Sequence, residues 1–93
     1  MKIGDGTNLP LLNAVASQVA GASVRPIGKD RAIQIDGISG DTVLIQVSND
    51  NTNWYTVTTA VADGHWQLTS TARYMRANVS VYSAGTITAS VTV

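Results

Sequence analysis

The side chains best suited to catalysis are few in this chain. His65 is its only histidine, so a serine–histidine–aspartate mechanism would have to use it as the base. The run Gly64-His65-Trp66 is typical of a turn entering a strand, and no nucleophile motif marks a serine partner. Cysteine is absent, which excludes disulfides and thiolate metal ligands. We therefore interpret His65 as a structural histidine and predict that the protein is not an enzyme.

An asparagine-rich stretch resembles the opening of a calcium loop. Asn49, Asn51 and Asn53 present oxygen donors at alternate positions, as such loops do. The loop would also need a later glycine and a bidentate glutamate, and Ala60 stands where that glutamate belongs. We interpret the stretch as a hairpin turn, and we predict no metal and no cofactor.

The aromatic residues are two tryptophans and three tyrosines, with no phenylalanine. Exposed aromatic rings could stack on sugars or anchor a protein interface. A short chain without phenylalanine also needs large side chains inside, so we expect Trp54 in the core. For Trp66 the core and the surface remain equal alternatives.

Arginines follow one of the expected strands. Arg73 and Arg76 flank Tyr74 and Met75, and two arginines on one strand usually mark a solvated face. With the cations elsewhere in the chain they could instead form a basic patch, whose other members would be Arg25, Lys29 and Arg31.

A central hairpin organises the predicted fold. In the predicted strand Val43, Ile45 and Val47 point one way, and the alternate residues Leu44, Gln46 and Ser48 point the other. Residues 49–53 predict the turn, because Asn and Asp side chains hydrogen-bond the local backbone. Trp54 and Tyr55 begin the second strand.

Further strands follow from the same alternation of apolar and polar residues. Ile33 and Ile35 face inward on a strand over residues 31–36, and Trp66 and Leu68 share a face after a turn at 62–64. Other strands are predicted at residues 22–27 (with Pro26 at an edge or bulge), 74–82 and 86–93.

The first part of the chain is less regular. Residues 1–10 contain glycines and a proline and predict an extended arm. Residues 11–21 fit either helical or strand spacing, and we expect a strand because the rest of the chain is β. We accordingly divide the chain into an N-terminal arm, residues 1–12, and a β-sandwich domain, residues 13–93.

The size and the charge of the chain limit the folds and the partners that we expect for it. Ninety-three residues suffice for one small domain. About seven short antiparallel strands predict an all-β fold, a single β-sandwich of immunoglobulin-like or jelly-roll-like type. Six basic and six acidic residues balance, which argues against nucleic-acid binding. No run approaches the ~20 apolar residues of a membrane span, so we expect no membrane association.

Three segments carry a resemblance to a known class of proteins. They are Ile45-Gln-Val-Ser-Asn-Asp-Asn-Thr-Asn-Trp-Tyr-Thr-Val57, Ala72-Arg-Tyr-Met-Arg-Ala-Asn-Val79 and Gly85-Thr-Ile-Thr88. Together they resemble small β-sandwich structural proteins of tailed bacteriophages, over roughly residues 33–93. Discoidin-type carbohydrate- and lipid-binding modules share the local pattern, but they are considerably longer and carry binding loops that this chain lacks.

The resemblance implies a non-enzymatic virion protein. We expect a capsid decoration, or cement, protein that stabilises the major capsid shell, with the major capsid protein as partner. It would be made in the bacterial host cytoplasm, act on the capsid surface of the virion, and form a homo-oligomer, a dimer or trimer. The alternative is a tail- or fibre-associated carbohydrate-binding module. The candidate interface or binding residues are Trp66, Tyr82, Arg73, Arg76, Leu9 and Leu11.

Overall fold

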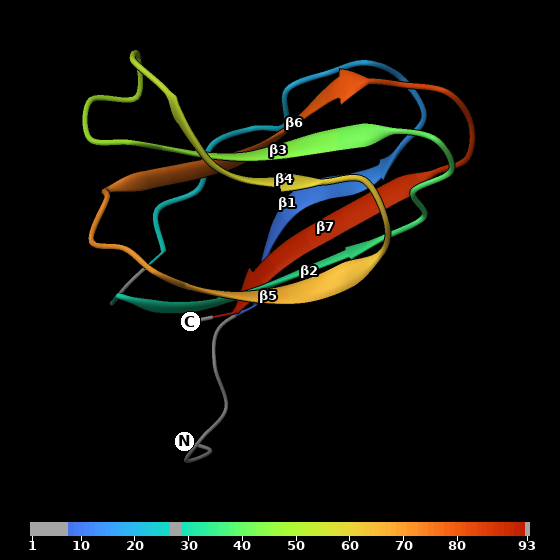
Figure 1. The fold of residues 1–93 in the computed structure, drawn as a ribbon. Helices are drawn as coiled ribbons and strands as arrows, with labels where there is room; N and C mark the ends of the chain where they lie inside the picture. Colours follow the sequence, from blue (N-terminus) through green and yellow to red (C-terminus); the bar gives the residue numbers. More distant parts are fainter. Residues whose placement is uncertain (1–7, 27–28, 93) are drawn as a thin grey trace.

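Two antiparallel sheets pack face to face in the computed structural model, which describes residues 8–26 and 29–92 (Figure 1). The strands in those ranges are β1 (Asn8–Val15), β2 (Asp30–Asp36), β3 (Thr42–Ser48), β4 (Tyr55–Ala60), β5 (Gly64–Thr69), β6 (Tyr74–Val81) and β7 (Ile87–Thr92). The prediction of a single all-β sandwich with about seven short antiparallel strands is confirmed.

The strand order separates the two sheets. One sheet runs β1-β7-β2-β5 and the other runs β4-β3-β6. The predicted central hairpin forms the β3–β4 pair, and β6 lies on the other side of β3. β7 lies between β1 and β2, whereas the immunoglobulin order places the last strand in the smaller sheet. The first and last described strands are therefore direct neighbours.

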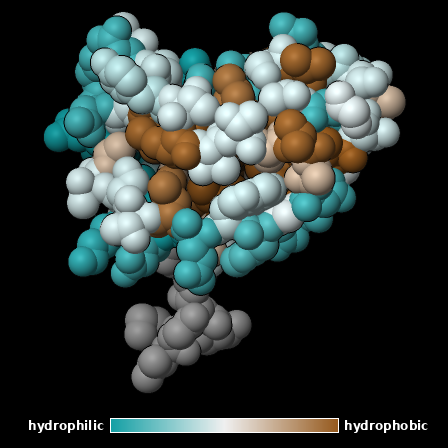
Figure 2. Space-filling view, viewed as in Figure 1, coloured by the Kyte–Doolittle hydropathy of each residue, from teal (hydrophilic) through white to brown (hydrophobic). Residues whose placement is uncertain are grey.

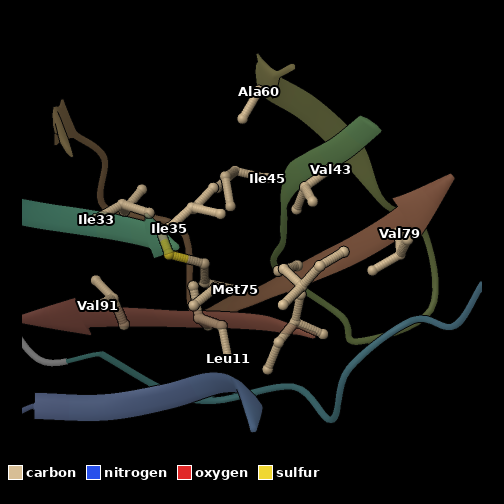
Figure 3. Close-up of a cluster of buried hydrophobic side chains, with 13 residues drawn as sticks. Leu11, Ile33, Ile35, Val43, Ile45, Ala60, Met75, Val79 and Val91 are labelled. Atoms are coloured by element: carbon tan, nitrogen blue, oxygen red, sulfur yellow. The ribbon is translucent and has the colours of Figure 1, made fainter. Parts of the chain in front are cut away.

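The core lies between the sheets and follows the predicted alternation. Ile33 and Ile35 of β2 are fully buried, as are Val43 and Ile45 of β3. β6 and β7 supply six further members of the core, and Figure 3 shows buried side chains from both sheets pointing toward one another. The β6 and β7 members are Met75, Ala77, Val79, Ile87, Ala89 and Val91.

The strand at the start of the chain begins earlier than predicted. Asn8, Leu9 and Pro10 pair with Thr92, Val91 and Ser90 in β7. The boundary expected at residue 12 thus lies inside β1, and residues 8–12 belong to the sandwich. Residues 1–7 of the predicted arm lie outside the described residues. For residues 11–21 the strand alternative is confirmed as far as Val15.

β1 also departs from simple alternation. Leu11 and Leu12 are consecutive, yet both are buried at 2% exposure. The pairing with β7 shifts between Pro10 and Leu12, and such a bulge turns two successive side chains toward the same face. Both leucines therefore belong to the core.

The strand predicted at residues 22–27 does not form over the described residues 22–26. Residues 19–24, which we call the edge segment, instead lie along the outer edge of β6 without forming a regular strand. The Gly21 N–H donates to the Ala77 carbonyl at 2.8 Å, and Val24 and Met75 exchange hydrogen bonds at 2.8 and 2.9 Å. Pro26, expected at an edge or a bulge, is buried just beyond this segment.

A buried carboxylate joins two loops at one end of the sandwich. Asp41 is 1% exposed, and its oxygens accept hydrogen bonds from the backbone N–H groups of Ser39 at 2.9 Å, Ala84 at 3.1 Å and Ser83. These hydrogen bonds hold the pKa of Asp41 below its usual value, because they favour the charged form.

Candidate interaction surface

β4 and the residue that follows it carry three apolar side chains exposed to solvent. Tyr55 is 70% exposed, Val57 41% and Val61, directly after the strand, 68%. These three form what we call the β4 surface. Among the described residues, they are three of five large apolar side chains that are exposed, the others being Val19 and Val81. Figure 2 shows apolar side chains gathered among neutral ones on the face where β4 and β5 lie.

The backbone at this edge is open as well. β4 is the end strand of its sheet, and no strand in the described part of the chain pairs with its outer side. Its pairing with β3 shifts between Ile45 and Gln46, which leaves Val57 without a partner across the ladder. The opposite edge of the sheet, at β6, is covered by the edge segment. An open edge with apolar side chains favours contact with another protein.

Four of the predicted binding residues pack against or within the core of the domain. Trp66 on β5 and Leu9 on β1 are partly buried against the core, and Leu11 lies within it. The Tyr82 hydroxyl donates to the Gly85 carbonyl at 2.7 Å, and its ring also packs against the core. Trp66 therefore combines the two alternatives left open for it, a core contact and partial exposure.

The other tryptophan is not in the core, so the prediction for Trp54 was wrong. Met75 and Ala77 point inward on β6, so Arg76 points outward, and its guanidinium carbon lies 4.4 Å from the centre of the Trp54 ring. The Arg76 Nε donates to Gln46 Oε1 at 2.8 Å. A cation–π contact on the outer face of the sheet thus accounts for the partial burial of the ring.

The two candidate arginines lie in different surroundings. Arg76 belongs to the outer face just described, with Trp54 and Gln46. Arg73 lines a cavity instead, together with three of the cations proposed as patch members, Arg25, Lys29 and Arg31. The structure therefore forms the basic patch without Arg76.

Asp50 organises the turn predicted from its asparagine neighbours. Its carboxylate accepts hydrogen bonds from the N–H groups of Thr52 at 2.9 Å and Asn53 at 2.8 Å, and from the Ser48 hydroxyl at 2.8 Å. These contacts keep its pKa well below the usual range. Within the described residues, no three His, Cys, Asp or Glu side chains lie close enough together to hold a metal ion.

His65 is exposed on β5, opposite Gln34 of β2. No hydrogen bond in the described ranges joins it to a serine or a carboxylate, so the geometry assembles no catalytic triad around it. No helix over those residues is long and apolar enough to cross a bilayer.

Comparison with known proteins identifies no relative. No protein-family model, no curated protein and no solved structure matches the chain.

Proposed function

We propose that this protein is a structural component of a tailed-bacteriophage virion, specifically a capsid decoration protein that binds the major capsid protein. The resemblance of residues 33–93 to small virion sandwiches supports the class. The observation that carries the proposal is the β4 surface, because it combines an open strand edge with exposed apolar side chains.

On this proposal the protein acts by burying surface rather than by catalysing a reaction. A capsid subunit, or a second copy of the chain, packs against Tyr55, Val57 and Val61 and removes their apolar area from water. Decoration proteins act after assembly of the shell, so contacts added between neighbouring capsid subunits oppose their separation. The dimer or trimer expected from the sequence would place several β4 surfaces around one symmetry axis.

The first experiment measures the copy number of the chain in purified virions of the phage that encodes it. Quantitative mass spectrometry against the major capsid protein is expected to give hundreds of copies in a simple ratio to the shell subunit. A handful of copies would place the protein in the tail or fibres, in favour of the carbohydrate-binding alternative. A complete absence would overturn a virion role.

A matched pair of variants tests the β4 surface. Val61→Lys places a charge on the open edge, and we expect it to weaken binding to capsids by about tenfold or more, because charge is costly in the centre of an interface. Val81→Lys is the control, since Val81 is 51% exposed at the end of β6, on the other side of β3. Equal capsid binding by both folded variants would contradict a contact through β4.

A further inference from the structure

A basic cavity lies where two loops meet at one end of the sandwich. It has a volume of about 650 Å³ and is lined by Arg25, Lys29, Arg31 and Arg73, with Thr71 and Ala72 between them. The first stretch comprises Arg25, Pro26 and Lys29 before β2, and the second, residues 70–73, joins β5 to β6. The Ser70 N–H donates to the Lys29 carbonyl at 2.8 Å and ties the loops together. We call this cavity the basic pocket.

The charge of the basic pocket is concentrated by the fold. The whole chain has six lysines and arginines against six acidic residues, and four of those six cations line this one cavity. No acidic residue is among the described residues that line it. Arg25, Lys29 and Arg73 form no ion pair within the described part of the chain. Their positive charges are therefore available to a ligand.

Two of the arginines are held in place by neighbouring groups. Arg31 is only 3% exposed, and its Nη2 donates to the Ala72 carbonyl at 2.9 Å and the Pro26 carbonyl at 3.4 Å. The guanidinium carbon of Arg25 lies 5.5 Å from the centre of the Tyr74 ring, within cation–π range. Arginines held in this way lose less conformational entropy when they bind a ligand.

Burial affects the electrostatics of the pocket wall. It lowers the pKa of Arg31, because removing the guanidinium from water disfavours its charged form. The group still carries its charge at neutral pH. A negatively charged ligand nearby would offset part of the cost of burying that charge.

We propose that the basic pocket binds a small polyanion, a ligand with two or more negatively charged phosphate or carboxylate groups. Guanidinium groups match the oxygens of phosphate and carboxylate in paired hydrogen bonds. The volume falls in the range of about 300–1,000 Å³ that is usual for small-molecule sites, and it exceeds what one isolated oxyanion fills. This site is independent of the β4 surface and of the proposed virion role.

Calorimetric titration of the full chain tests the proposal with two probes, inorganic pyrophosphate and citrate. We expect saturable binding of one molecule per chain to at least one of them, with affinity that falls as sodium chloride is added. Tighter binding of pyrophosphate would identify phosphate groups as the ligand chemistry, and tighter binding of citrate would identify carboxylates. Equal binding would indicate a site that accepts both. Failure of both probes to saturate would overturn the proposal.

Exposed pocket residues provide variants that keep the fold. Arg25→Gln and Arg73→Gln are each expected to weaken binding of the better probe about fivefold or more, since each removes a charge-assisted contact. Arg76→Gln is the matched control, because it removes the same charge outside the pocket and should stay within about twofold of the wild type. An unchanged affinity in both pocket variants, or an equal loss in the control, would refute the site.

Discussion

Asp41 illustrates what a single side chain does in this small domain. Its two oxygens accept three backbone hydrogen bonds. One comes from Ser39, two positions earlier in the chain, and the others come from Ser83 and Ala84, more than forty positions later. The carboxylate thereby fastens the loop before β3 to the loop between β6 and β7. Because the carboxylate is buried, these three N–H groups provide the hydrogen bonds that it needs in its charged form.

Replacing this carboxylate gives a prediction about pH. The folded pKa of Asp41 is lowered, so its charged form contributes stability above the unfolded pKa of about 4, and that contribution is lost as the pH falls through the folded value. We expect Asp41→Asn to have a lower free energy of unfolding than the wild type at pH 7, with a difference that shrinks between pH 5 and pH 2. Urea denaturation across that range measures it.

The control for this prediction is Asp36→Asn. Asp36 is exposed on β2 and accepts one hydrogen bond, from the Gln34 side chain, so its replacement should change stability little at any pH. A difference between Asp41→Asn and the wild type that stayed constant down to pH 2 would show that the charge of Asp41 is not what matters.

Single residues were the hardest level to predict from the sequence. Trp54 was expected inside because large apolar side chains usually fill cores, but Arg76, 22 positions later in the chain, covers its ring from outside. The basic pocket joins Arg25 and Arg73, whose proximity depends on the pairing of loops rather than on any spacing. The sequence therefore identified possible members of a basic patch but not which of them lie close together.

At the level of elements, regular alternation predicted the strands well. β2, β6 and β7 bury every second side chain over most of their length, and β3 does so as far as Ile45. All four strands were predicted within a residue or two of their ends. β1 resisted prediction because its bulge buries Leu11 and Leu12 together. The pairing of the edge segment could not be predicted, because isolated backbone bridges to β6 require no alternation of apolar and polar side chains.

Gly21 allows a test of how the edge segment closes the sandwich. A Cβ at this position would lie 2.1 Å from the Leu11 carbonyl oxygen and 2.9 Å from the Leu12 side chain. Gly21→Ala must therefore push the edge segment away from β1, and we expect it to lower the free energy of unfolding by about 1–3 kcal/mol. Chemical denaturation measures the change.

Gly64→Ala serves as the comparison. An added Cβ there would approach the rim of the Trp66 ring at 2.9 Å, and a side chain can move aside more easily than a backbone carbonyl. We expect a smaller loss of stability than for Gly21→Ala. The opposite order would contradict the view that the backbone of β1 limits the space at Gly21.

For the molecule as a whole, the ends of the described chain determine how it can be shortened. A protein that begins at Leu11 differs from one that begins at Asn8 by three pairs between β1 and β7 and by the partly buried Leu9 side chain. We expect the free energy of unfolding of the protein that begins at Leu11 to be lower by about 2 kcal/mol or more.

Denaturation of the two truncated proteins measures this difference. The sequence-based division into an arm over residues 1–12 and a domain over residues 13–93 leads to a different expectation, that both proteins fold equally well. Equal stability of the two would favour that view over the pairing of residues 8–10 with β7.

The central place of β7 also bears on how the protein folds during synthesis. Both β1 and β2 pair with β7, so these two strands leave the ribosome long before their shared partner exists. Until then the nascent chain exposes apolar strands with open edges. Such strands on nascent chains of neighbouring ribosomes can pair with one another and aggregate. Slow translation of the codons just before residue 87 would lengthen that interval, and a chaperone that shields strand edges would protect the chain during it.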